Sequence, residues 1–473
     1  MGYSAARTKT VSFLRRRPFQ EPGLAKNMTE GNALKGGTLG PMSLIGLGLS
    51  YILVGNYVAW GYALQAGGIG GLLSSLVLVV ALFVCIALCL SELVGLHPSA
   101  GGGAAIVARA LGAPLGHLAA AAVLIEYVCG TAALASFAAG YVEPLLGISG
   151  GWVMLLLLGG VALLHIVGVN EALGFSLIIA GIAIAGIIVF SIAAVPHLDW
   201  SRLRDIPPGP GYTAWFPSGL RGAWAALPFS VTFFITLEGV PFAAEEASNA
   251  KRDIPLAMFG TLAIGAISAM TVSILGPAAA GALTLAGAPD PIEQALRTIH
   301  SEHAAVLGKL VECAASASLV ASVFGGIFAS SRIIFHLGRL GAVPRFLATT
   351  NRRGAPWLAV LVSAIAAAVL ARGADSAQLV VLFVFSATLL YLLLLLSHLV
   401  LRLREADAPR PFRSPGGLFL PVFGAALAGI AFIACFLADV RWSIVGILLS
   451  VGVATLLLVS EKRSRGQTQT CKT

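Results

Sequence analysis

The sequence predicts an all-α protein that crosses a lipid bilayer many times. Its residues are 58% hydrophobic and only 11% charged, whereas charged residues make up about a quarter of an ordinary soluble domain. Its mean hydropathy is +0.91. The segment from Gly36 to Ser91 contains no Asp, Glu, Lys or Arg. Because such a segment cannot cover a surface that faces water, we predict a polytopic membrane protein rather than a set of soluble domains.

Apolar runs between polar breaks predict about twelve membrane spans, since one spanning helix needs roughly 20 apolar residues. The pair Gly67-Gly68 predicts the turn between the first two spans. The predicted spans are residues 42–64, 70–93, 114–140, 152–169, 172–195, 223–247, 256–282, 304–337, 355–372, 376–401, 418–438 and 442–460.

These spans divide the chain into five regions. A basic cytoplasmic tail (1–40) precedes a core of ten helices (41–403), and a cytoplasmic loop (404–417) separates that core from two further helices (418–460). Residues 461–473 form a second cytoplasmic tail. The first tail lacks the apolar core and the cleavage site of a removable signal, so we expect the first helix to direct insertion itself.

The distribution of basic residues predicts the orientation. If the N-terminus is cytoplasmic, the inside segments hold 23 of the 30 Lys and Arg residues and the outside segments hold seven. This bias is what the positive-inside rule requires. We therefore predict a multi-pass protein of the cell (inner) membrane with both termini in the cytoplasm. The net charge of +9 then reflects orientation and contact with anionic membrane lipid, not binding of nucleic acid.

Cysteine and histidine give no sign of a metal or a cofactor. The six cysteines are scattered through apolar segments and the C-terminal tail, which makes disulfides and a zinc site improbable. His165, His336 and His398 have no His-Glu-x-x-His pattern and no acidic ligand set beside them. We expect them to be ordinary packed histidines, and we assign no metal and no cofactor.

Two glutamates lie at mid-membrane depth in the predicted helices. Glu126 is in the middle of the third span and Glu238 is within the sixth. A charged side chain at that depth costs a few kcal/mol and therefore calls for a reason. One reason is structural, a carboxyl kept protonated and hydrogen-bonded to a neighbouring helix. The other is functional, because no Lys or Arg lies at a similar depth and an incoming ammonium group would supply the missing charge.

Glycine and proline near these positions predict breaks in two helices. Gly239 and Pro241 follow Glu238, and the first span contains Gly55-Asn56. Unwinding at such points exposes backbone polar groups toward a cavity. Breaks in the first and sixth helices indicate two inverted repeats of five helices, with a substrate site between the broken helices. For the glycines alone, close packing of helices is the other explanation.

Three further sets of residues are weaker candidates. Glu92 lies at the cytoplasmic end of the second span, and Glu245-Glu246 lie one to two turns inside the sixth break. We interpret these three glutamates as gate or interface residues. Serines on the eighth span could coordinate sodium, although serine is routine at membrane helix interfaces. These serines are Ser316, Ser318 and Ser322.

The residues resemble the amino acid, polyamine and organocation transporters over almost the full chain. Within that superfamily they are similar to the ethanolamine permease branch. The superfamily resemblance rests on Ser91–Leu93, Pro98–Gly103 and Arg109–Gly112, on Ala329–Arg332 and Gly341–Pro344, and on Arg410–Gly417. The narrower resemblance rests on Leu124–Tyr127, on Gly55–Tyr57 with Trp60, on Glu238–Val240 and on Ala243–Glu246 with Lys251–Pro255.

This resemblance implies a five-plus-five inverted repeat with broken helices 1 and 6, two extra C-terminal helices, and alternating access driven by protons, sodium or exchange. The chain departs from the pattern in two places. Asn56 stands where the ethanolamine branch prefers Glu, and Ala250 replaces a familiar proline. The glycine-rich cradle that related carriers present to a carboxylate is also not cleanly present in Val54–Asn56, which favours an amine that lacks a carboxylate.

The sequence therefore predicts a secondary transporter of a small amine-bearing solute, ethanolamine or a similar amino alcohol. The alternative is an amino acid permease or exchanger of the same superfamily. An enzyme would need a nucleophile and a base, or a metal set, at one depth, and no such constellation is present. A receptor or a channel has little support. The predicted substrate-binding residues are Gly55, Asn56, Glu126, Phe234, Glu238 and Gly239.

Two carboxylates facing one monovalent amine leave one charge unmatched. The second carboxyl must then be protonated or matched by a co-transported cation, so we expect a proton or sodium as the coupling ion. Free backbone amides at a helix break would stabilise a carboxylate. Glu126 lies on a continuous helix, which offers no such amides, so its carboxyl should keep a proton more readily. We therefore expect Glu126 to be the coupling residue.

Overall fold

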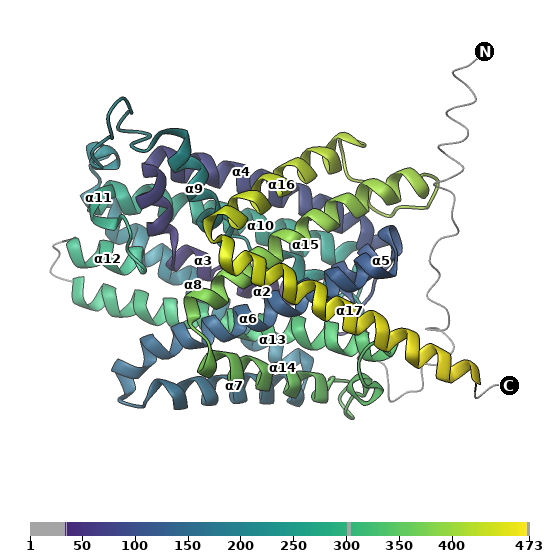
Figure 1. Ribbon diagram of the computed structural model, residues 1–473. Helices are drawn as coiled ribbons and strands as arrows, with labels where there is room; N and C mark the ends of the chain where they lie inside the picture. Colours follow the sequence, from purple (N-terminus) through teal and green to yellow (C-terminus); the bar gives the residue numbers. More distant parts are fainter. Residues whose placement is uncertain (1–33, 35, 300–303, 471–473) are drawn as a thin grey trace, which may run out of the picture.

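The computed structural model describes residue 34, residues 36–299 and residues 304–470, and these residues form a bundle of α-helices (Figure 1). Nine helices of the described part are long and apolar enough to cross a bilayer. The protein is therefore an all-α polytopic membrane protein. Most of the predicted N-terminal tail, residues 1–33 and 35, lies outside the described residues.

The helices follow the predicted spans closely from the third to the fifth and from the seventh to the eleventh. Lipid offers no partner for backbone N–H and C=O groups, so each crossing segment satisfies them within itself as a helix. These helices are α6 (Ala113–Leu146), α7 (Gly150–Val167), α8 (Val169–Ala194), α10 (Ala250–Ala280), α13 (Ala304–Leu340), α14 (Trp357–Gly373), α15 (Ser376–Arg404) and α16 (Phe419–Ala438).

The first predicted span is broken further along than expected. It consists of α2 (Pro41–Ile52) and α3 (Val54–Tyr57), and α4 (Trp60–Leu96) then begins after an interruption at Val58 and Ala59. Ala59 has a φ of 74°, a left-handed conformation that is uncommon for a residue with a side chain. The expected break at Gly55-Asn56 is thus wrong by about three residues. The predicted turn does occur, as a kink within α4 at Gly68, whose φ is 64°.

The sixth predicted span is also interrupted. It is divided into α9 (Gly219–Val231) and the 3-10 helix η4 (Leu237–Ala243). The residue before η4, Thr236, has a φ of 72°. The two non-glycine residues with positive φ in the described chain are Ala59 and Thr236, so both left-handed positions lie in the two broken helices.

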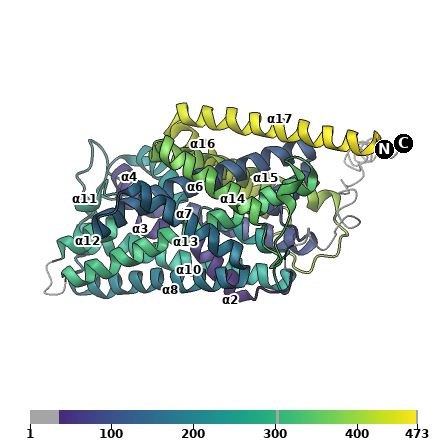
Figure 2. The same ribbon diagram turned by 90° about the horizontal axis from the view of Figure 1, so that it is seen from below.

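The last helix, α17, extends beyond the predicted span and runs from Val440 to Thr470. The predicted C-terminal tail therefore continues as a helix over 461–470, and Figure 2 shows it projecting past the end of the bundle. A short helix that we did not predict, α5 (Gly102–Leu111), lies between the second and third spans. The remaining short elements are η2 (Val195–His197), η3 (Trp200–Arg204), α11 (Ala282–Leu285), α12 (Pro291–Thr298) and η5 (Arg345–Ala348).

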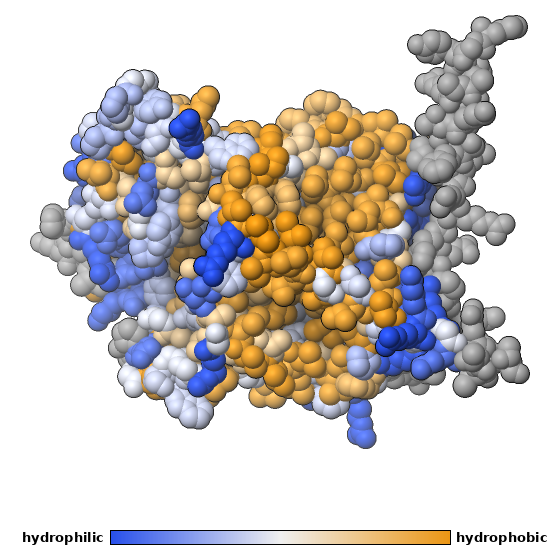
Figure 3. Space-filling view, viewed as in Figure 1, coloured by the Kyte–Doolittle hydropathy of each residue, from blue (hydrophilic) through white to orange (hydrophobic). Residues whose placement is uncertain are grey.

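The surface shows where lipid contacts the bundle. Figure 3 shows a broad apolar band across the middle of the visible face, with hydrophilic residues gathered toward the two ends along the helix direction. Exposed large apolar side chains such as Ile182, Ile192, Ile365 and Val369 lie on the spanning helices. The same residue types that would drive aggregation in water here face hydrocarbon.

At the centre of the bundle, η4 contacts α2, α4, α5, α10 and α13. Close approach between the two broken helices depends on Gly55 in α3. A Cβ placed there would lie 2.3 Å from the carbonyl oxygen of Thr232 and 2.6 Å from Cα of Phe233. The backbones of the first and sixth helices therefore touch at this glycine, as small residues permit in membrane proteins.

We expect Gly55→Ala to destabilise the folded protein by about 1–3 kcal/mol, because the new methyl group meets backbone atoms that cannot rotate away. The matched control is Gly159→Ala in α7, where a Cβ would meet no atom within 4 Å. Thermal unfolding of the detergent-solubilised protein measures both. Equal melting temperatures for the two variants would contradict the packing role of Gly55.

Candidate functional site

The break in the sixth helix places the Glu238 carboxyl inside the bundle. Between α9 and η4 the chain turns at Thr236, whose backbone N–H donates a hydrogen bond to Tyr391 Oη at 3.1 Å. Pro241 removes one backbone donor within η4. A side chain of α15 thus satisfies a backbone group that the break leaves without a helical partner.

Glu238 is 1% exposed and half of its carboxyl is free of hydrogen bonds. Tyr127 Oη donates to Glu238 Oε1 at 2.9 Å, whereas Oε2 has no hydrogen-bond partner among the described residues. Tyr391 also lies close enough to interact with the carboxyl. Two tyrosine hydroxyls, from α6 and α15, therefore surround a carboxyl that no cationic side chain approaches within ion-pair distance in the described chain.

Glu126 is the second buried carboxyl of the site. It is fully buried, and no donor of another described residue reaches its oxygens, although its carboxyl lies within hydrogen-bonding reach of Glu238 when one of the two is protonated. It lies close enough to Glu238 to interact with it electrostatically. The structure therefore brings together the two glutamates that the sequence separates by more than one hundred residues. An unpaired buried carboxyl is costly, and two side by side form a site that attracts a cation.

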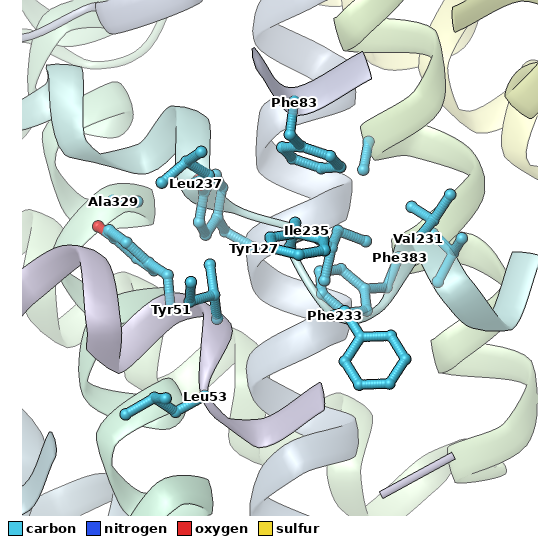
Figure 4. Packing of buried hydrophobic residues seen from close by; sticks show 14 of the residues in the cluster. Tyr51, Leu53, Phe83, Tyr127, Val231, Phe233, Ile235, Leu237, Ala329 and Phe383 are labelled. Atoms are coloured by element: carbon cyan, nitrogen blue, oxygen red, sulfur yellow. The ribbon is translucent and has the colours of Figure 1, made fainter. Parts of the chain in front are cut away.

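Aromatic rings pack around this part of the bundle, and Figure 4 shows three of them, Tyr51, Phe83 and Tyr127, among buried apolar side chains. Phe83 of α4 contacts Phe234 with ring centroids 5.6 Å apart and Tyr391 with centroids 5.2 Å apart. Tyr127 packs edge-to-face against Phe242 at 5.9 Å and against Tyr51 at 6.0 Å. Aromatic faces also attract cations that have lost their water, so the rings and the carboxyls favour the same kind of ligand.

The other predicted site residues are buried but make different contacts. Gly239 adjoins the carboxyl pair, and a Cβ there would lie 2.6 Å from Tyr127 Oη and 2.7 Å from Tyr51 Cζ. Asn56 donates from Nδ2 to the Leu53 carbonyl at 3.4 Å, and its Oδ1 has no partner. Within the described residues no hydrogen bond joins Asn56 to either glutamate. Gly55 contacts the backbone of the sixth helix, as described above.

The predicted gate residues form ion pairs with α13 just beyond the site. Glu246 and Arg332 are both fully buried, with Arg332 Nη2 2.9 Å from Glu246 Oε1 and Nε 3.3 Å from Oε2. The Arg332 guanidinium lies 3.7 Å above the Phe328 ring. Arg339 pairs with Glu245 at 2.9 Å. These contacts hold the segment after η4 against α13.

The backbone before the first helix is fixed at the same place. The N–H groups of Thr38 and Leu39 donate to the Glu246 carbonyl at 3.0 and 3.1 Å, and Ser248 N donates back to the Leu39 carbonyl at 2.8 Å. The chain leaving the sixth helix is thus hydrogen-bonded to the chain entering the first. Together with the ion pairs, these bonds close one end of the bundle.

Glu92 is an interface residue, as the sequence suggested, and a well-paired one. His398 Nε2 lies 3.2 Å, Arg402 Nη2 2.7 Å and Arg410 Nε 2.7 Å from its carboxyl oxygens. Ser414 donates to it from both its backbone N and its Oγ. Glu92 therefore joins α4 to α15 and to the loop after α15. His398, expected to be isolated, is a partner in this cluster.

Sequence reasoning missed the tyrosines of the site. Tyr51, Tyr127 and Tyr391 come from three helices far apart in the sequence, and a tyrosine in an apolar segment is unremarkable by itself. The serines on α13 bond to the backbone instead of forming an evident ion site: Ser318 Oγ donates to the Ala315 carbonyl and Ser322 Oγ to the Ser50 carbonyl. Ser316 Oγ has no partner.

Comparison with known proteins identifies a family. Residues 38–456 match the family model described as amino acid permease. An uncharacterized transporter of Rhizobium meliloti is 29% identical over 238 residues, which cover 48% of this chain and 48% of the relative. The branched-chain amino acid permease of Lactococcus lactis is 25% identical over 362 residues, covering 72% of this chain and 76% of that protein.

A plant protein shows a similar level of likeness. The vacuolar cationic amino acid transporter 4 of Arabidopsis thaliana is 28% identical over 365 residues, covering 72% of this chain and 58% of that protein. The match to the Rhizobium relative spans about half the length of that protein. The Lactococcus and Arabidopsis relatives carry the names of transporters of different classes of amino acid.

We expect Arg332→Met alone to destabilise the protein by about 3–5 kcal/mol, since it leaves the Glu246 carboxylate buried without a partner. The double variant with Glu246→Leu should recover much of this loss, because it removes both charges. Thermal unfolding of the parent, both single variants and the double variant forms the test. Losses that simply add in the double variant would show that the two side chains do not act as a pair.

Proposed function

The chain belongs to the amino acid permease family, and from this premise we propose that it is a secondary transporter of a small amine-bearing solute, ethanolamine or a similar amino alcohol. The observation that carries the proposal is the pair of buried carboxyls, Glu126 and Glu238, which have no cationic partner in the described chain. An ammonium group would supply the missing charge and donate hydrogen bonds to the free oxygens.

The groups available to a substrate in this site are chiefly acceptors. Three of the four oxygens of Glu126 and Glu238 are without a hydrogen bond. Of the nearby donors, Thr236 N bonds to Tyr391 and Arg332 is bound to Glu246, whereas Tyr51 Oη has no hydrogen-bond partner among the described residues. A substrate carboxylate would find two like charges here and one free hydroxyl, that of Tyr51. This supports an amine that lacks a carboxylate.

An amino acid permease or exchanger is the second candidate. It is favoured by the names of the relatives, which are a branched-chain amino acid permease and a cationic amino acid transporter. A cationic amino acid could present its side-chain ammonium to the two glutamates. Its carboxylate would then need a donor outside the contacts described above.

The mechanism we propose is alternating access, in which the end that the Glu246–Arg332 pair closes opens in turn with the opposite end. Glu238 and Glu246 lie on one short segment, η4 and the turn that follows it. A cation bound at Glu238 can therefore bias the position of the segment whose other end forms the Arg332 gate. A bound cation shifts the equilibrium between the closed and open gate only to the extent that it binds one of these two states more tightly than the other. Both termini and the gate would face the cytoplasm, as the basic residues predict.

Glu238→Gln should abolish uptake while leaving the protein folded, because the amide preserves the shape of the side chain but not its charge. Ethanolamine should raise the melting temperature of the purified parent by mass action and should not raise that of the variant. The control is Glu143→Gln, an exposed glutamate on α6, which should behave as the parent. Short diamines and amino acids in the same screen decide the substrate class.

Two results would contradict this assignment. Near-normal uptake and affinity in Glu238→Gln would return Glu238 to a structural role. A parent protein that is stabilised by neutral amino acids, and not by amines, would replace the proposed substrate with that of the second candidate.

The second glutamate gives a separate prediction about coupling. A monovalent amine neutralises one of the two carboxyls, so the other binds the coupling cation, and we propose that Glu126 binds a proton. Glu126→Gln mimics the protonated carboxyl, so exchange of amine across proteoliposomes should persist while pH-driven accumulation disappears. Glu143→Gln again serves as the control. An unchanged pH profile in the variant, or parental transport that follows sodium and ignores pH, would exclude this role.

A further inference from the structure

A second group of titratable side chains lies away from the carboxyl pair, where α5, α6, α13 and α17 meet. It borders a small cavity of about 30 Å³, which is large enough for one or two water molecules. Small residues, Ala104, Ala108 and Gly116, form part of its wall. The titratable residues at the cavity are His117, His336 and Glu461, each at most 5% exposed.

The surroundings of His117 favour a proton on both of its ring nitrogens. Nδ1 lies 2.7 Å from the carbonyl oxygen of Ala113, and Nε2 lies 2.9 Å from Glu461 Oε2. Arg465 also pairs with Glu461, which favours an ionised carboxylate. Nδ1 must carry a proton to donate to the Ala113 carbonyl oxygen. Nε2 makes no aligned hydrogen bond within the described residues, but a second proton there gives the ring the positive charge that the nearby carboxylate attracts. The geometry therefore identifies His117 as an imidazolium cation.

This contact lies on the part of α17 that extends past the apolar span. Beyond Glu461, Ser464 Oγ accepts a hydrogen bond from Arg345 Nη2 at 3.4 Å. A Cβ at Gly341, just after α13, would lie 2.6 Å from the same Oγ. The end of α17 is therefore attached to α6 through His117 and to the end of α13 through Ser464.

Other charges face the His117–Glu461 pair from each neighbouring element. They are Arg465 on α17, His336 and Arg339 on α13, and Glu245 after η4. Arg339 and Glu245 are paired with each other in the gate described above. Among these groups, the histidines are the side chains whose ordinary titration lies between about pH 5 and 8.

We propose that His117 and Glu461 form a proton-operated strap that holds the end of α17 against α6 and α13. While His117 carries two protons, Nδ1 donates to the Ala113 carbonyl and the imidazolium charge attracts the Glu461 carboxylate, so the helices stay joined. Loss of one proton turns one of the two contacts into a repulsion between a lone pair and an oxygen. The end of α17 is then released. The strap joins α6, which carries Glu126, to α13, which carries Arg332. Because His117 is protonated in an acidic medium, the strap then stabilises the closed gate.

Hydrogen–deuterium exchange of the full-length protein in lipid nanodiscs tests the strap without any substrate. After correction for the chemical exchange rate, protection of the amides of residues 455–467 should fall as pH rises from 5.5 to 8.5. One linked proton limits the change to about tenfold per pH unit. His117→Gln and Glu461→Gln should show low protection at every pH. His117→Lys keeps a permanent cation near Glu461 and should show high protection that does not change with pH.

His336→Gln is the matched control, because it removes the neighbouring histidine and leaves the ion pair intact. It should retain the parental pH profile. Two outcomes overturn the proposal. One is a parental pH profile in His117→Gln, and the other is loss of the pH dependence in His336→Gln. Size-exclusion profiles of each variant establish that the bundle is folded, so a change in protection reports the strap itself.

Discussion

The structure depends on one costly arrangement, two carboxyls buried next to each other in the centre of a membrane protein. Glu126 and Glu238 are at most 1% exposed, and water cannot reduce the repulsion between their charges there. Folding tolerates the pair because Tyr127 donates to Glu238 and because a carboxyl can remain protonated when it is buried. The same pair becomes favourable when a cation binds. The free-energy cost of burying the two carboxyls without a cation and the affinity of the site for a cation thus have the same origin.

The helix breaks are the second condition for this arrangement, and tertiary contacts satisfy the backbone groups that they free. Thr236 N bonds to a tyrosine of α15, and Ala59 N donates to the Pro289 carbonyl at 3.2 Å, in the segment between α11 and α12. Both residues have positive φ without being glycine, a strain of order 1–3 kcal/mol each. Such strain persists only where the surrounding structure holds it, and both points lie in the two broken helices.

The sequence was sufficient to predict the spans, the two glutamates and the existence of breaks, because each of these has a local signal: apolar length, charge at depth, and glycine or proline. It could not locate the break of the first helix, which falls at Val58 and Ala59 and not at Gly55. Gly55 is needed for contact with the sixth helix, and sequence alone does not separate a glycine that packs from one that bends. The partners of Glu238, Glu246 and Glu92 were also beyond reach, since each contact joins residues from distant helices.

The site and the gate are linked by the short distance between Glu238 and Glu246 along one rigid segment. In η4 the tight 3-10 turns leave little freedom, and Gly239 packs directly against Tyr51 and Tyr127. Tyr51 in turn lies close enough to interact with both Arg332 and Glu238. Because Gly239 packs against the Tyr51 ring, a movement of η4 toward a bound cation would displace that ring. Because Glu246 is held by a bidentate ion pair and by backbone bonds to Thr38 and Leu39, the gate should open as a unit. A gate with two stable states can open fully in response to a small movement of Glu238, whereas independent contacts would break one at a time.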